Sequence, residues 1–216
     1  MNNSAISLEN TKLYTLYFYE LWWLSHSICQ KCENLFKETA IPDDGFLMQV
    51  NPEIHSIIAS LLSDASNIKK LIDTPAGKLR GEPSAQARLR KERAEALKEK
   101  IKSVELTEML NHKVRNTLEH FDEYLDEANL KLSRQDKPSS PMAAYNMVFS
   151  HWEVTSPRVY PVRLYISSER KFYNMKWNVD IGKIYEEATA ILLELRKLPE
   201  FSQQKDVGGL MVRLDN

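Results

Sequence analysis

Three polar residues in the middle of the chain have the types and spacing needed for acid–base chemistry on a phosphate: Arg115, Asn116 and His120. An imidazole titrates near neutral pH and can take or give a proton. A guanidinium binds phosphate oxygens through two parallel hydrogen bonds. Asn116 stands four residues before His120, so on a helix the amide can contact the imidazole and orient it. These residues are therefore the candidate catalytic group.

The composition of residues 85–132 predicts a long helix, in which we expect Glu105–Leu132 to be unbroken. Its apolar residues share one stripe, expected to face the core: Leu110, Val114, Leu118, Phe121, Leu125, Ala128 and Leu132. At about 100° per residue, the three polar residues point away from that stripe. The candidate group is thus expected on the surface or at a subunit interface.

The pattern of arginine, polar residue and later histidine resembles the motif of the HEPN superfamily (higher eukaryotes and prokaryotes nucleotide-binding domains). Arg115, Asn116 and His120 match its three positions. The resemblance covers the six residues 115–120 and the helical layout. It implies a bundle of four to five helices, a homodimer through the motif helix, and an RNA substrate or ligand. Many members are metal-independent ribonucleases of toxin–antitoxin or phage-defence systems, with a cognate antitoxin or nucleotidyltransferase as partner; others are inactive.

In members that a nucleotidyltransferase silences, a tyrosine two residues after the histidine is modified. This chain has Asp122 there and Tyr124 two residues further on. The departure counts against silencing of that kind.

Positive and negative charge are segregated along the predicted long helix. Residues 78–102 hold nine Lys and Arg against four Glu, whereas residues 105–127 hold seven acids against two bases. Charged runs on helices are usually solvated faces; contact with RNA phosphates is the alternative reading for Arg88, Arg90, Lys91 and Arg93. The basic segment can serve RNA binding at the motif only if it folds beside His120. The acidic segment favours a binding or structural role over cleavage.

Three further helices and one short one are expected. They lie at about Leu8–Glu38, from the N-cap Asn51 to a stop before Pro75, at Ile181–Leu198, and within Pro141–Ser150. The first carries two adjacent apolar stripes, so we expect it to be buried on two sides, in the bundle and in a dimer.

Residues 158–179 are rich in β-branched and aromatic side chains and predict a β-hairpin, with strands at Val159–Ile166 and Lys171–Val179. We therefore predict one mainly α, HEPN-like domain over residues 1–216. The hairpin is inserted before the last long helix, and residues 199–216 form a C-terminal tail.

The composition excludes several classes of protein. An apolar share of 43% and a charged share of 27% exclude wholesale disorder, and a net charge of −1 excludes a uniformly basic nucleic-acid-binding surface. The six glycines form no phosphate-binding loop, and no hydrolase or metalloprotease motif occurs. Cys29 and Cys32 are interpreted as two cysteines on a helix face, because a structural zinc site would need a second pair of ligands. We therefore expect no metal, and we expect no cofactor. No signal peptide and no membrane-length apolar run is evident, which predicts a cytoplasmic protein without a membrane anchor.

Three functions remain open from the sequence. The leading one is a metal-independent endoribonuclease, with Arg115 stabilising the phosphate, His120 transferring a proton and the ribose 2′-hydroxyl attacking. The second is a catalytically inactive module that binds RNA, a nucleotide or a protein. The third is a purely structural helical bundle.

Overall fold

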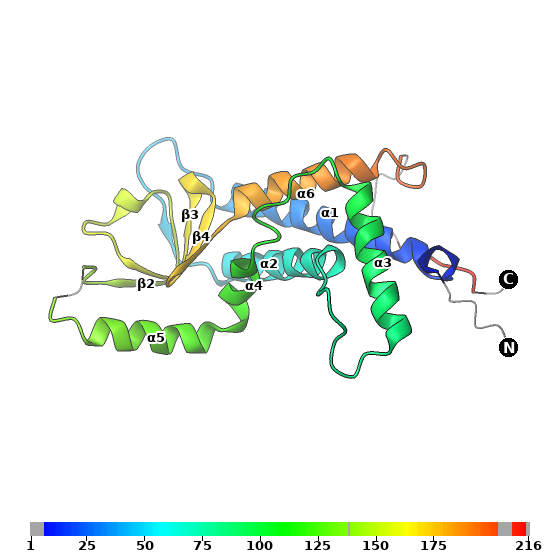
Figure 1. Cartoon of the computed structure of the whole chain (residues 1–216). Coiled ribbons are helices and arrows are strands. Elements are labelled where there is room, and N and C mark those ends of the chain that lie inside the picture. Colours follow the sequence, from blue (N-terminus) through cyan, green and yellow to red (C-terminus); the bar gives the residue numbers. More distant parts are fainter. Residues whose placement is uncertain (1–6, 138, 203–208, 215–216) are drawn as a thin grey trace.

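The structure, a computed structural model, describes residues 7–137, 139–202 and 209–214, without the side chains of residues 114, 115, 117 and 118. Figure 1 shows a group of long helices beside a small sheet, with one further helix running along the sheet. The fold is therefore mostly helical but mixed α and β, rather than a helical bundle with a single inserted hairpin.

Three long helices form the centre of the helical part: α1 (Tyr14–Glu38), α2 (Pro52–Ile72) and α6 (Ile181–Leu195). A short 3-10 helix, Leu8–Asn10, precedes them, and α3 (Ser84–Lys100) crosses the end of α2 that is farthest from the sheet. The long helix α1 packs against α2 on one side and α6 on the other. The predicted two-sided burial of α1 is thus confirmed, but a single chain supplies both partners. The second apolar stripe consequently gives no support for a dimer.

The starts of two helices follow their capping residues. The Asn51 side chain accepts a hydrogen bond from the Glu53 backbone N at 3.0 Å, as the sequence predicted for α2. In α6, Asp180 accepts from the Lys183 backbone N at 2.8 Å. The final helix begins where predicted and ends three residues earlier, at Leu195.

Five strands form one sheet in the order of the sequence. They are β1 (Met48–Gln49), β2 (Ala143–Phe149), β3 (Tyr160–Ile166), β4 (Lys171–Asn174) and β5 (Trp177–Asp180). Only β2 and β3 pair in parallel; the other neighbours are antiparallel. Two 3-10 turns, Trp152–Val154 and Ser167–Glu169, lie in the connections around β3.

The predicted hairpin over residues 158–179 is present as β3 and β4, but its second arm turns at residues 175–176 and continues as β5. The short helix predicted within Pro141–Ser150 is wrong, because that segment holds β2. Its alanines and methionines suit a helix, but Val148 and Phe149 are buried and pair with Tyr165 and Ile166 of β3. Tertiary pairing overrides a weak local preference here.

The long helix predicted over residues 85–132 is also wrong. It is divided into α3, an irregular segment, α4 (His112–Glu119) and α5 (Phe121–Ser133). Asn111 starts α4 by accepting from the Lys113 backbone N at 3.1 Å, and His120 ends it with non-helical φ and ψ of −118° and 35°. Because α5 is a separate helix, its inward face differs from the predicted stripe.

That inward face of α5 packs along the sheet (Figure 1). Phe121, Tyr124 and Ala128 contact a small cluster with Val162 and Met175. Leu125, which the predicted stripe placed in the core, is 38% exposed, and the side chains of residues 114 and 118 lie outside the described part of the chain.

A larger cluster of buried apolar side chains runs from the helices into the sheet, joining Leu21, Ile28 and Leu61 to Tyr165 and Phe172. No helix among the described residues is both long and apolar enough to cross a membrane.

Candidate functional site

The candidate catalytic residues lie on α4 and at its end. Asn116 is half-buried, and its backbone carbonyl accepts from the His120 backbone N at 3.3 Å. No hydrogen bond joins the Asn116 and His120 side chains within the described part of the structure. The Arg115 side chain lies outside the described residues. The structure therefore places two members of the group one helical turn apart and leaves the third undescribed.

His120 sits at the junction of α4 and α5, where the backbone leaves the helix. Its side chain is 40% exposed, and its Nδ1 is 3.4 Å from Oε2 of Glu123. The imidazole can thus reach solvent and any ligand on this surface. A neighbouring carboxylate of this kind can orient a histidine for proton transfer.

Beyond His120, rings from three elements form a row that the sequence did not predict. The ring centroids of His120 and Tyr124 are 6.1 Å apart, those of Tyr124 and Trp177 are 5.7 Å apart, and those of Trp177 and His112 are 5.9 Å apart. Nζ of Lys176 lies 4.5 Å from the Tyr124 centroid and 5.7 Å from that of Trp177, and it also pairs with Glu127. We call these five residues, His112, His120, Tyr124, Lys176 and Trp177, the ring surface.

His112 and His120 stand at opposite ends of the ring surface. Eight residues along an α-helix correspond to a rise of about 12 Å. That separation is too large for the two imidazoles to serve as base and acid on one phosphodiester. His112 is better suited to contact a neighbouring part of a longer ligand.

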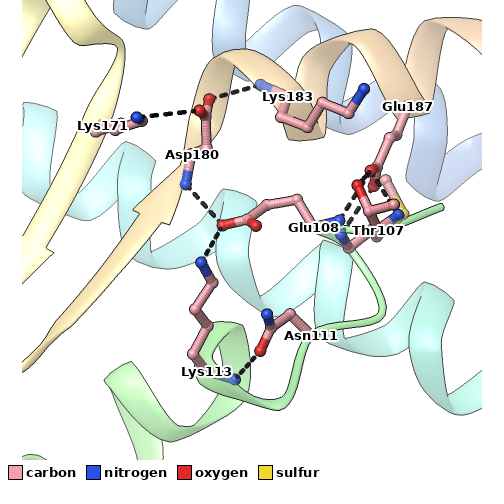
Figure 2. Close-up of polar contacts among 9 residues, drawn as sticks. Thr107, Glu108, Asn111, Lys113, Lys171, Asp180, Lys183 and Glu187 are labelled. Carbon is pink, nitrogen blue, oxygen red and sulfur yellow. Dashed lines mark hydrogen bonds and ion pairs between the residues drawn. The ribbon is translucent and has the colours of Figure 1, made fainter.

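Buried polar contacts fix the start of α4 (Figure 2). Glu187 of α6 is 2% exposed, and its carboxylate accepts from the backbone N of Thr107, Glu108 and Met109 at 2.7–2.8 Å and from the Thr107 hydroxyl at 3.0 Å. Successive backbone N–H groups that converge in this way bind an anion well. The irregular segment before α4 is therefore held against α6.

Glu108 extends these contacts to the sheet. Its Oε1 accepts from the Asp180 backbone N at 2.8 Å and lies 3.0 Å from Nζ of Lys113 in the first turn of α4 (Figure 2). Because Asp180 ends β5, this bridge ties α4 to the strand that carries Trp177. The contact between His112 and Trp177 follows from it.

The four predicted phosphate contacts lie on α3, at the opposite end of α2 from α4 (Figure 1). Arg90 pairs with Glu82 at 2.9 Å and donates to the carbonyls of Pro75 and Gly77. The Arg90 guanidinium, together with a hydrogen bond from the Leu79 backbone N, lowers the pKa of Glu82 to about 2. Most of the hydrogen-bonding capacity of Arg90 is thus used within the chain.

Arg93 donates to the carbonyls of Leu71 and Lys70 at the end of α2, at 3.2 and 3.1 Å, and its guanidinium stacks on Tyr17. Arg88 lies 3.5 Å from Glu92, one turn further along α3, and Lys91 is exposed. The structure therefore does not bring the basic segment beside His120.

Neither cysteine is placed for reactivity or metal binding. Cys29 and Cys32 are buried and reduced on α1, and burial raises the pKa of both thiols. Within the described ranges, no group of three or more His, Cys, Asp or Glu side chains is arranged to hold a metal ion.

Comparisons of the chain with protein-family models, with curated proteins and with solved structures find no match.

Proposed function

We propose that this protein is a HEPN-like RNA-binding protein that cleaves RNA without a metal ion, with His120 as the proton-transferring residue. The observation that supports the proposal is the ring surface. It combines an exposed imidazole with aromatic rings, on which unpaired bases stack, and with an ammonium group.

The reaction requires a base for the ribose 2′-hydroxyl, an acid for the leaving 5′-oxygen, and positive charge beside the phosphorane. His120 supplies one of the two proton transfers, Arg115 the charge, and Asn116 orients the imidazole or binds a phosphate oxygen. As one histidine cannot be base and acid in a concerted step, a second copy of the chain or water supplies the other proton. We therefore propose a homodimer whose α4 helices meet.

A second candidate is a HEPN-like module that binds RNA or a protein without cleaving. Acidic side chains around His120 favour it: Glu119, Glu123 and Asp126 are exposed, and Glu127 pairs with Lys176. Phosphates approach such a surface poorly. The paired arginines of α3 do not offset this charge.

Incubation of a labelled single-stranded RNA with the purified protein in excess EDTA separates the two candidates. For a ribonuclease we expect products with 2′,3′-cyclic phosphate or 3′-phosphate ends, no cleavage of DNA, and a rate reduced ~100-fold or more in His120→Ala. His112→Ala should weaken RNA binding and leave kcat nearly unchanged, and His26→Ala on α1 is the matched distant control.

RNA binding without cleavage, equal in wild type and His120→Ala, would favour the binding module. A requirement for Mg²⁺ would contradict the proposed mechanism. If the protein is a toxin of a defence system, inducing the wild type in a bacterium should stop growth, whereas inducing His120→Ala should not.

A further inference from the structure

A pocket of about 390 Å³ lies between the end of α1 and the β3–β4 turn, apart from the ring surface. One wall comes from the end of α1 and the residues after it, and the other from β3 and the turn. The lining residues are Phe36, Thr39, Ala40 and Ile41 on the first wall and Tyr165, Ser167, Ser168 and Arg170 on the second.

The backbone of Arg170 is fixed at the edge of this pocket, and its side chain is exposed. Its backbone has a positive φ of 51°, an unfavourable region for a residue with a side chain, and its carbonyl accepts from the backbone N of Ile181 and Gly182. A Cβ on Gly182 would come within 3.3 Å of the Arg170 Cβ, so the absence of a side chain there makes room for Arg170. The guanidinium carbon lies 4.2 Å from the centroid of Phe36.

The guanidinium of Arg170 has no carboxylate or carbonyl partner in the described part of the chain. Two other arginines that stack on rings differ in this respect, whereas Arg163, stacked on Phe121, does not. Arg158 stacks on Trp152 and lies 3.6 Å from Glu153, and Arg93 stacks on Tyr17 and donates to two carbonyls. The hydrogen-bond donors of Arg170 are therefore available to a ligand.

The inner wall of the pocket adds one hydroxyl group with an unused donor. The buried hydroxyl of Ser167 has no hydrogen-bond partner among the described residues, whereas the hydroxyl of the fully buried Tyr165 is paired with the Thr39 side chain. Buried polar groups are rarely left unpaired, since desolvation without a partner is costly. A guanidinium and an unpartnered hydroxyl group favour a ligand that accepts hydrogen bonds and carries negative charge.

We propose that this pocket binds an oxyanion, the phosphate or carboxylate group of a small organic molecule. Arg170 binds it through two parallel hydrogen bonds, as guanidinium groups do with planar or tetrahedral oxyanions. The Ser167 hydroxyl group donates to the same group after a small side-chain movement. The body of the ligand packs on Phe36, Ala40 and Ile41.

A purely structural role for Arg170 is the competing explanation. Its charge lies near the C-terminus of α1, where the helix dipole favours a cation. Such a role predicts a loss of stability in Arg170 variants, whatever ligand is present. Ligand binding measured in folded variants therefore distinguishes the two roles.

The test uses the full chain with phenyl phosphate, benzoate and the neutral control phenol, measured by calorimetry and by backbone amide NMR. We expect a Kd on the order of 1 mM for at least one anion, no binding of phenol, and shifts at residues 167–170. The better anion identifies the ligand as phosphate or carboxylate. Arg170→Asn, which suits a positive φ, should bind at least about tenfold more weakly, whereas Arg158→Gln should bind as the wild type does.

Ala40→Phe fills the apolar side of the pocket and keeps Arg170, so it provides an independent test if Arg170→Asn does not fold. We expect this variant to lose binding of the anion. The proposal is overturned if wild type binds neither anion, or if Ala40→Phe or folded Arg170→Asn binds as tightly as wild type.

Discussion

Near the two ends of α2, charged side chains bind opposite ends of the peptide group: N–H groups at one end and carbonyls at the other. Nearer the sheet, the Glu187 carboxylate accepts from three successive backbone N–H groups before α4. At the other end, Arg93 donates to backbone carbonyls of α2, and Arg90 to carbonyls of the following connector. Both ends thus use buried or half-buried charge to bind backbone groups that lack a partner within their own helix or turn.

The comparison shows that a count of charges does not identify a binding surface. By composition α3 is the basic segment, with phosphate contact as one of its two interpretations, yet two of its arginines, Arg90 and Arg93, are occupied by the chain itself. The segment around α4 is acidic by composition, yet it presents exposed imidazoles and aromatic rings. If RNA binds, we expect it at the sheet end of α2.

The largest expected effect is on the sheet end, in Glu187→Gln. The amide keeps the shape but turns an NH₂ donor toward backbone N–H groups and removes the charge that they stabilise. We expect the free energy of unfolding to fall by about 3 kcal/mol in urea denaturation. Glu186→Gln, an exposed neighbour on α6, should change it by less than about 0.5 kcal/mol. A loss below about 1 kcal/mol in Glu187→Gln would show that the carboxylate does not hold this end.

A smaller loss is expected at the α3 end, in Arg93→Met. The variant keeps packing against Tyr17 and leaves the last carbonyls of α2 without their donor, so unfolding should cost about 1–2 kcal/mol less. Affinity for single-stranded RNA, measured by fluorescence anisotropy, should stay at the wild-type value. Unchanged stability with weakened RNA binding would move the RNA site to α3.

The third prediction compares two lysines. Lys176→Gln should weaken RNA binding several-fold and reduce the dependence of log K on log salt by about one, as expected when one phosphate contact is lost. Lys91→Gln removes an exposed charge from α3 and should change neither. The reverse result, with only Lys91→Gln affecting the salt dependence, would contradict the assignment of RNA to the ring surface.

The sequence predicted the elements whose stability is local. The 3–4 residue periodicity identified α1, α2 and α6, and Asn51 marked the start of α2 correctly, because capping and helical periodicity are set by residues within a turn or two of one another. The β3–β4 hairpin was likewise found from its composition. By contrast, β1 has only two residues and forms through pairing with Val148 and Phe149.

The candidate site could be found only in part. Asn116 and His120 are near neighbours in sequence, and their proximity on α4 was predictable. Trp177 and Lys176 come from a different element, and they reach α4 through Glu187 and Glu108, whose partners are some 80 and 72 residues away. The same long-range contacts interrupt the helix predicted over residues 85–132. Helical periodicity does not reveal contacts between residues so far apart, so neither this interruption nor the position of Trp177 beside α4 could be predicted.

The smallest expected effect uses pH to separate the two ends of α2. Burial, with a further contribution from the positive charge of Arg163, lowers the pKa of His55 below its ordinary 6.5, although the Asn146 backbone opposes this shift. A histidine whose pKa is lower in the folded protein than in the unfolded chain contributes most to stability above the unfolded pKa. That contribution is lost as pH falls from about 6.5 toward the lower folded pKa.

At the α3 end the folded pKa of Glu82 is about 2 against an ordinary 4.5, so that contribution is lost only as pH falls below 4.5. Between about pH 7 and pH 5, His55→Leu should therefore lose less thermal stability than wild type, while Glu82→Gln should follow the wild-type slope. Below about pH 4.5 the thermal stability of Glu82→Gln should fall less steeply with pH than that of wild type. Parallel curves for His55→Leu and wild type would mean that His55 takes up its proton in the folded protein as readily as in the unfolded chain.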